Sequence, residues 1–195
     1  MIERMKDWTL KYLDYRKLEE LTRSEMDKGG LREGLYLLVL SQLLNMAALF
    51  VSFPIAVYFV PSPLALDQVA IALAKVSVLG IVVFYAVGLM MFLFSMLLGG
   101  KGKLESQLYI LCLFTLCGRI VSTPFVILSA VDPISFLMLV MISVIGLYGL
   151  YAAFVALRTV HGFSSLRAAV ALILSFAATL LVIGVLGIAL GVPPA

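Results

Sequence analysis

Hydrophobic residues occur along this chain in five long runs that polar residues rarely interrupt. The runs cover residues 35–60, 69–98, 104–130, 134–157 and 166–191. Each is longer than the roughly 20 apolar residues that a helix needs to cross about 30 Å of hydrocarbon. A membrane β-barrel would instead show apolar and polar residues in alternation, whereas these runs are continuous. The pattern therefore predicts an all-α, polytopic membrane protein with five transmembrane helices packed as a bundle.

Turn-forming residues separate the runs. They are Pro-Ser-Pro at 61–63, Gly-Gly-Lys-Gly-Lys at 99–103, Asp-Pro at 132–133 and His-Gly at 161–162. Proline and glycine in short polar segments favour turns over continued helix. We expect the five helices to end within several residues of these positions.

The first 30 residues follow a different pattern. Eight of the fourteen Lys and Arg residues and eight of the eleven acidic residues fall at or before Glu33. Met5, Trp8, Tyr12 and Tyr15 fall on one face of a helix, with most charges elsewhere. The apolar core of a signal peptide is missing after the first methionine. Residues 1–30 are therefore predicted to form one amphipathic helix, and residues 31–195 the five-span domain.

Four residues are expected to lie at the membrane interface. Trp8 and Tyr12 belong to the amphipathic helix, and aromatic side chains favour the interface over water. Lys101 and Lys103 lie in the loop after the second run, where lysines would meet anionic lipid headgroups.

Composition also indicates a lipid environment. Hydrophobic residues make up 63% of the chain and charged residues 13%, compared with about 45–50% and about 25% in ordinary globular domains. So few polar residues cannot coat a water-soluble core. A soluble globular domain is excluded.

The basic residues predict an orientation. The N-terminal segment and the loops around 101–103 and 158–167 hold twelve of the fourteen Lys and Arg residues on one side of the predicted membrane. The other side has Asp67 and Asp132, with Lys75 as its only nearby base. Because loops rich in Lys and Arg stay in the cytoplasm, we expect a cytoplasmic N-terminus and an extracytoplasmic C-terminus.

Arg119 is the one basic residue deep in a predicted span. An arginine there costs at least about 2.5–3.5 kcal/mol, so a polar partner is expected. The candidates are Gln42 and Asn45 of the first span, or Asp67 and Asp132 at the outer boundary. Pro124 also frees the carbonyl of Ile120 beside the arginine. One interpretation is a structural arginine held by such groups, and the alternative is a site for an anionic ligand between helices. We expect the structural role.

The first span is the most polar of the five. Ser41, Asn45 and Ser52 recur at near-helical spacing, and Gln42 lies beside them. Such residues can line a pore, but in membrane proteins they more often form hydrogen bonds between helices. We prefer the second interpretation.

Small residues recur in the last two spans. Gly146, Gly149 and Ala153 have the spacing of Gly184, Gly187 and Gly191. Such strips allow close packing of helices within the bundle, and Gly187 with Gly191 also forms a GxxxG pattern that would support a homo-oligomer.

The sequence shows none of the arrangements typical of catalysis or metal binding. Cys112 and Cys117 lie within one apolar run, and His161 is the only histidine, so a metal cluster is not indicated. His161 has no serine nucleophile in a recognisable turn and is expected to be an interfacial loop residue. The segment 99–103 lacks the spacing of a phosphate-binding loop. We expect no enzyme activity, no cofactor and no nucleic-acid partner; membrane lipids are the expected contacts.

Three short segments together resemble a known family. They are Gly-Gly-Leu-Arg-Glu-Gly at 29–34, Gly-Gly-Lys-Gly at 99–102, and the stretch 158–169 that contains Val-His-Gly-Phe-Ser at 160–164. With the five runs, they are similar to the Yip domain family, membrane proteins named for interaction with Ypt/Rab GTPases. The resemblance covers roughly residues 21–191.

The resemblance implies a five-helix bundle with a cytosolic N-terminus and no catalytic residues. Eukaryotic members act in early secretory traffic and bind prenylated GTPases. The N-terminal segment of about 30 residues is short by comparison, which makes the chain more similar to compact prokaryotic or archaeal members and puts GTPase recruitment in doubt.

Two functional hypotheses follow. The leading one is a non-enzymatic membrane protein that organises protein partners or lipids through its cytosolic helix and basic loops. The alternative is a small transporter or channel with a site near Arg119 and the polar first span, because Pro54 and Pro124 provide the helix breaks that transport sites often use.

Overall fold

The computed structural model describes residues 2–59, 66–131 and 134–189. Within these ranges the chain forms seven α-helices: α1 (Ile2–Leu13), α2 (Leu18–Glu25), α3 (Leu31–Phe59), α4 (Leu66–Leu97), α5 (Leu104–Leu128), α6 (Ser135–His161) and α7 (Ser165–Ala189). The last five are long and apolar enough to cross a membrane. The predicted all-α class and the five spans are confirmed.

The N-terminal segment contains two helices, so the prediction of a single amphipathic helix was wrong. Between α1 and α2, the backbone N–H of Arg16 donates to the Asp14 carboxylate at 3.1 Å. The N–H of Lys17 donates to the carbonyl of Asp14 at 2.8 Å. A carboxylate that binds the backbone two residues later favours a turn over continued helix. Asp14 therefore separates α1 from α2.

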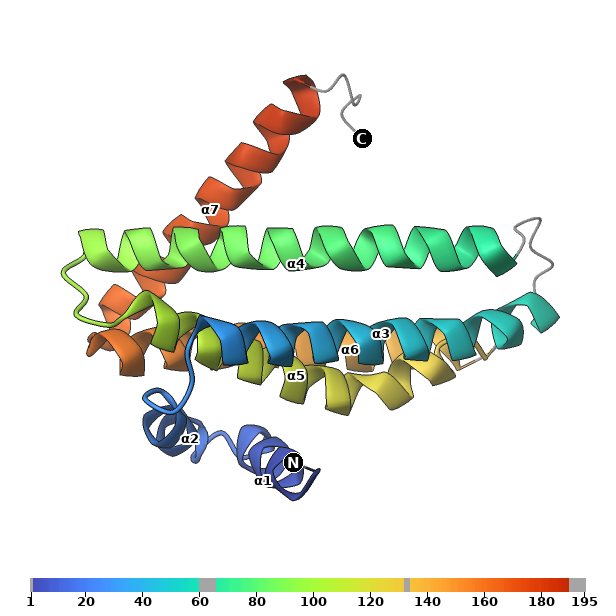
Figure 1. Ribbon diagram of the computed structural model, residues 1–195, viewed down its shortest axis with the longest axis horizontal. Helices are drawn as coiled ribbons and strands as arrows, with labels where there is room; N and C mark the ends of the chain where they lie inside the picture. The colour runs from blue at the N-terminus through green and yellow to red at the C-terminus, as the bar shows by residue number, and fades with distance from the viewer. Residues whose placement is uncertain (1, 60–65, 132–133, 190–195) are drawn as a thin grey trace.

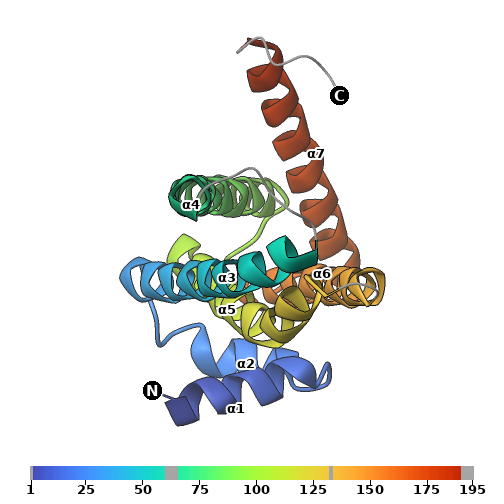
Figure 2. The same cartoon turned by 90° about the vertical axis from the view of Figure 1, so that its right-hand side faces the viewer.

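The five long helices and the N-terminal pair form three layers. α3, α5 and α6 make the central layer, with α5 in contact with both of the others. α4 lies on one face of this layer, and α1 and α2 lie on the other (Figures 1 and 2). α7 begins beside α6 and runs past α4 at a steep angle.

The core of the molecule follows α5. Nearly every residue from Ser106 to Cys117 is buried, whereas most described residues of α4, α6 and α7 are partly or fully exposed. Side chains from α1, α2, α6 and α7 pack around this segment. α5 is therefore the central helix, and the exposed apolar sides of its neighbours are the surfaces that would face lipid.

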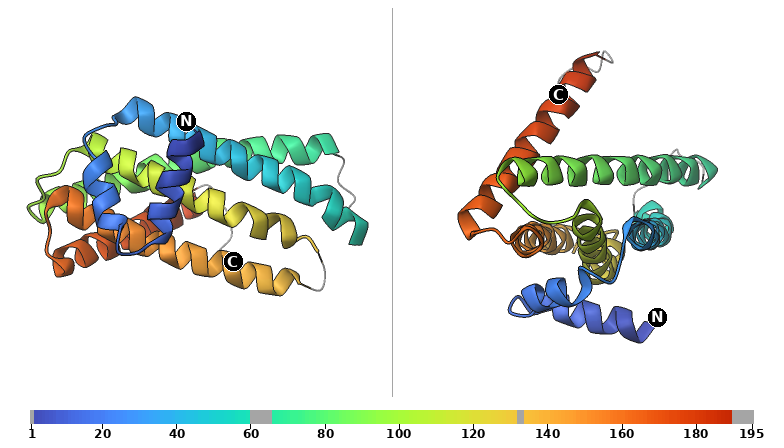
Figure 3. Two further views of the ribbon diagram at one scale, coloured as in Figure 1. Left: turned by 90° about the horizontal axis from the view of Figure 1, so that it is seen from below. Right: turned by 60° about the vertical axis from the view of Figure 1, so that its left-hand side comes forward.

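The N-terminal helices pack on the bundle through their apolar faces. Trp8 is 6% exposed, Tyr12 is 1% exposed, and Leu18 and Leu21 are buried with them. The Tyr12 ring lies 5.2 Å from the ring of Tyr148, edge to face, and the Tyr148 hydroxyl donates to the carbonyl of Tyr12. Seen from below, α1 and α2 lie across the central layer (Figure 3).

This packing places the side chains of Trp8 and Tyr12 within the protein, and their expected role at the membrane interface stays a prediction. Both side chains are enclosed by protein, whereas Ile2, Leu10, Leu13 and Tyr15 of the same segment are exposed together with its charged residues. Aromatic side chains bury about 150–250 Å² each, and the apolar surface of α5 and α6 lies within their reach. Full burial between helices removes more apolar area from water than a shallow position in the headgroup layer.

Candidate functional site

Arg119 and Asn45 meet between the central helices. Arg119 lies in α5, and its Nη1 donates to Oδ1 of Asn45 in α3 at 3.0 Å. Within the described ranges no carboxylate forms an ion pair with Arg119. The structure thus joins one of the two predicted amide partners to the arginine.

Gln42 is the other candidate partner that the structure describes. The amide nitrogen of Gln42 lies 3.4 Å from the position that a Cβ on Gly80 of α4 would take, and in the described part of the chain it forms no hydrogen bond with Arg119. Asp132 and the side chain of Asp67 lie outside the described residues.

Ser52 shows what the polar residues of α3 do. Its hydroxyl donates to the carbonyl of Ala48 in its own helix at 2.7 Å and to the carbonyl of Val126 in α5 at 3.3 Å. With the bond from Arg119 to Asn45, two polar residues of α3 bind α5. This arrangement favours the interpretation that the polar residues of α3 form hydrogen bonds between helices over the interpretation that they line a pore.

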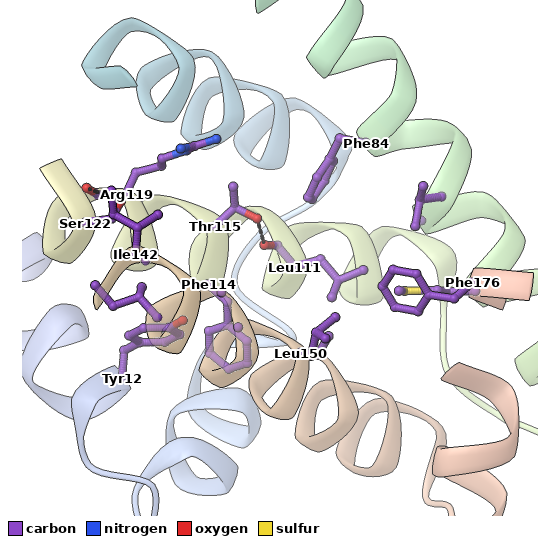
Figure 4. A pocket seen from close by; sticks show the side chains of 18 residues that line it. Tyr12, Phe84, Leu111, Phe114, Thr115, Arg119, Ser122, Ile142, Leu150 and Phe176 are labelled. Atoms are coloured by element: carbon purple, nitrogen blue, oxygen red, sulfur yellow. Dashed lines mark hydrogen bonds between the residues drawn. The ribbon is translucent and has the colours of Figure 1, made fainter. Parts of the chain in front are cut away.

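A cavity of about 400 Å³ extends from Arg119 through the middle of the bundle. Its walls come from α4, α5, α6 and α7, and Tyr12 of α1 closes one side. Phe84, Phe114 and Phe176 are among its mostly apolar lining residues, and Arg119 is the charged one. Figure 4 shows the Arg119 side chain extending from α5 toward α3, on the side of α5 where Phe84 lies. We call this space the Arg119 cavity.

A second polar cluster lies where the predicted motif loops meet. The backbone N–H of Gly102 donates to Nδ1 of His161 at 3.2 Å. Nε2 of His161 lies 2.7 Å from Oε1 of Gln107, and Nε2 of Gln107 donates to the carbonyl of Gly88 at 3.0 Å. Because Nδ1 accepts, the proton of the neutral ring is on Nε2, which donates to Gln107. One continuous series of hydrogen bonds therefore joins α4, the loop after it, α5 and the end of α6.

The glycines of the loop at 99–103 are needed because His161 and the end of α6 pack directly against its backbone. A Cβ on Gly100 would lie 2.6 Å from Nδ1 of His161 and 2.8 Å from the carbonyl oxygen of Ser95. A Cβ on Gly102 would lie 2.7 Å from the carbonyl oxygen of Val160. Gly162, which ends α6, has φ +64° and so adopts the left-handed conformation that favours glycine.

His161 is buried at 3% exposure, so the expectation of an interfacial loop residue was wrong. The imidazole stacks on the ring of Phe163 at 5.4 Å and lies 5.9 Å from the ring of Phe92. Burial is tolerated because both ring nitrogens have hydrogen-bond partners. Lys101 and Lys103, on the same loop, are exposed.

Ion pairs hold α2 to the rest of the molecule. Glu19 pairs with Arg158 of α6 and with Arg23, 2.8 Å away. Glu25, almost fully buried, pairs with Arg4 at 2.8 Å and Lys28 at 3.0 Å. Burial opposes ionisation of Glu25, but hydrogen bonds from these two bases outweigh it and lower the pKa of the carboxyl.

Comparison with known protein families identifies the family of this chain. A model of the Yip1 domain matches residues 19–186. The chain belongs to the Yip1 domain family. Yip1-domain proteins are generally non-enzymatic membrane proteins, and this one is a multi-pass protein with five candidate spans. The comparisons with curated proteins and with solved structures gave no match.

Sequence reasoning missed Gln107, Glu19 and Glu25. Gln107 had a usable signal, because an amide near the start of an otherwise apolar run needs a buried partner. Glu19 and Glu25 had none, since the charges around them in the sequence are those of an ordinary solvated helix. Gly191 lies outside the described residues and so does the side-chain environment of Gly187, so the GxxxG prediction stays a prediction.

Proposed function

We propose that this Yip1-domain protein organises the membrane surface without catalysing a reaction, by holding anionic lipid headgroups at a fixed platform. The platform consists of α1, α2, the α4–α5 loop (residues 98–103) and the α6–α7 loop (residues 162–164). The packing of Trp8 and Tyr12 against α5 and α6 carries this proposal, because it fixes the charged faces of α1 and α2 relative to the spans.

Charge distribution on the platform supports lipid headgroups as the contacts. Bases of α1 and α2 are largely paired, such as Arg4 and Lys28 with Glu25. Lys101, Lys103 and Arg167 are exposed and form no ion pair within the described ranges. Each lies within a few residues of the end of a span, where a cation near an anionic leaflet gains about 1 kcal/mol.

Lipid competition tests the proposal. The purified protein is offered equal amounts of phosphatidylglycerol and phosphatidylcholine, and bound lipids are counted by native mass spectrometry. We expect phosphatidylglycerol to be enriched, and the double variant Lys101→Gln, Lys103→Gln to lose most of that enrichment. Lys75→Gln, which changes an exposed lysine in the far half of α4, should keep the wild-type ratio. Equal binding of the two lipids by the wild type contradicts the proposal.

The Arg119 cavity favours transport of small anions as the second candidate function. A charged group beside a cavity between helices is an arrangement found in transporters. Chloride, phosphate and acetate flux into proteoliposomes would be compared for the wild type and Arg119→Ala. Transport predicts flux above empty liposomes that the variant loses, and the organising function predicts no flux in either.

A further inference from the structure

The guanidinium of Arg119 is incompletely satisfied by protein groups. Arginine carries five N–H donors, and the described residues provide one acceptor, Oδ1 of Asn45. The neighbouring hydroxyls of Ser122 and Thr123 donate to the carbonyl of Arg119, and in the described part of the chain neither accepts from its guanidinium. Arg119 is partly buried and lines the Arg119 cavity, and hydrogen bonds to a charged donor contribute more than those between neutral groups. A hydrogen-bond acceptor on a ligand would therefore bind favourably to the free donors of Arg119.

The surroundings of the guanidinium select the type of acceptor. Most of the cavity wall is aliphatic or aromatic. Phe84 of α4 lies on the side near Arg119, and Phe176 of α7 lies farther from it (Figure 4). At about 400 Å³ the cavity has the size of a small-molecule site. A soluble anion would satisfy Arg119 and leave the apolar walls uncovered, and a neutral lipid chain would do the opposite.

We propose that the Arg119 cavity binds a single-chain anionic amphiphile, with its carboxylate or phosphate on Arg119 and its hydrocarbon chain along the walls formed by α4, α5 and α6. The planar guanidinium matches both headgroups, because two parallel N–H donors can bind two oxygens. Asn45 holds the guanidinium in place through Nη1 and leaves its other donors for the ligand.

Small residues make the room for the chain. Gly118 of α5 and Gly146 and Gly149 of α6 line the cavity. A Cβ on Gly146 would meet no atom within 4 Å. A larger side chain at this position would extend into the cavity without disturbing the backbone. Such a substitution would exclude the hydrocarbon chain of the ligand and leave Arg119 unchanged.

Thermal unfolding of the full-length protein in a neutral detergent tests the proposal. Oleate and hexadecyl phosphate carry the two anionic headgroups, and oleyl alcohol carries the same kind of chain without charge. We expect either or both anionic amphiphiles to raise the unfolding temperature in a saturable manner, and oleyl alcohol to have no such effect. Hydrogen bonds to charged groups predict at least about tenfold weaker binding for the alcohol.

Two variants address the two ends of the site. Arg119→Gln removes the charge, and Gly146→Leu fills the space for the chain. Each should weaken the apparent affinity for the anionic amphiphile about tenfold or more. Arg32→Gln, on the exposed start of α3, and Val144→Leu, on an exposed face of α6, are the matched controls and should bind as the wild type does.

Three results of these experiments would contradict the proposal. If Arg119→Gln fails to fold, Gly146→Leu still tests the site. A stabilisation equal for oleate and oleyl alcohol, or retained in full by Gly146→Leu, would show that the amphiphiles act through the micelle. Absence of any stabilisation by both anionic amphiphiles would show that water or protein alone satisfies Arg119. Any of these results overturns the proposal.

Discussion

His161 shows how a single residue connects two motifs that are far apart in the sequence. Its imidazole accepts from Gly102, 59 residues earlier, and contacts Gln107, 54 residues earlier. The Gly-Gly-Lys-Gly and Val-His-Gly-Phe-Ser segments therefore form one structural unit, in which glycine is required because the imidazole occupies the space that a side chain would need.

A pair of glycine substitutions should have opposite effects. In Gly102→Ala the new methyl would lie 2.7 Å from a backbone carbonyl and 2.9 Å from Nδ1 of His161, so we expect a loss of stability of about 1–3 kcal/mol. In Gly146→Ala the methyl meets open space, and alanine favours helix by up to about 1 kcal/mol. Thermal unfolding in detergent checks both. Equal effects of the two substitutions would contradict the close packing at Gly102.

At the scale of elements, the N-terminal helix pair behaves as part of the bundle. Its buried side chains, Trp8, Tyr12, Leu18 and Leu21, contact α5 and α6. Its charged side chains form ion pairs with one another and with Arg158. The pair is an amphipathic unit whose aromatic and leucine cluster is covered by protein, while Ile2, Leu10 and Leu13 of α1 stay exposed.

Trp8, the single tryptophan, reports directly on this packing. We expect blue-shifted emission and weak acrylamide quenching in detergent as well as in liposomes, because the indole is buried in the protein beside Glu25 and Arg4. Brominated lipids should quench it little. Tyr12→Ala, which removes a large side chain from the buried cluster that contains Trp8, should increase acrylamide quenching. Strong quenching by brominated lipids in the wild type would restore the interfacial interpretation.

Low pH should loosen the same helix pair. The pKa of Glu25 and that of Glu19 are lowered in the folded protein, Glu19 chiefly by its hydrogen bond from Arg23. A lowered carboxyl pKa stabilises the fold above the ordinary value near 4.5. That contribution is lost as the pH falls from this value through the lowered pKa. Trp8 quenching should therefore increase below about pH 4.5.

The matched variants for this pH effect are Glu25→Gln and Glu20→Gln. Glu25→Gln removes the titrating group, so its helix pair should be looser at pH 7 and change less with acid. Glu20 is exposed and forms no ion pair in the described part of the chain, so Glu20→Gln should follow the wild type. An identical acid response in Glu25→Gln would mean that other groups cause the loosening.

How far the sequence predicts these elements depends on the range of the interactions that form them. The five spans were predictable because apolar content over some 20 residues decides insertion, and Asn45 was among the named partners of Arg119. The break at Asp14 was missed because a local Asx turn overrides the helical pattern. The burial of His161 was missed because its partners lie more than 50 residues away.

Across the whole molecule, the long helices exceed the membrane. α4 has 32 residues, about 48 Å at 1.5 Å per residue, against about 30 Å of hydrocarbon. An upright α4 would extend roughly 18 Å beyond the hydrocarbon. We expect the excess at the end where α4 meets α5, because the charged helix α2 lies nearer that end of the central layer (Figure 1) and charge is costly in lipid.

Cysteine labelling tests the orientation that the basic loops predict. Cys112 and Cys117 are buried, so an introduced cysteine should dominate the signal. In intact cells a membrane-impermeant maleimide should label Gln68→Cys, exposed near the start of α4, and should label Lys103→Cys only after lysis. Lys103 is preferable to Gly102, where a side chain does not fit. The reverse labelling pattern would reject a cytoplasmic N-terminus.

The docking of α1 and α2 also sets the order of events during biosynthesis. Tyr12 bonds Tyr148, 136 residues later, and Glu19 pairs with Arg158, 139 residues later. At about 5–20 residues per second, the ribosome needs on the order of ten seconds to make this stretch. During that time Trp8, Tyr12 and their leucines have no native surface to cover them, and a chaperone or the lipid surface must shield them. α1 and α2 are thus synthesised before their binding surface and reach their native positions late.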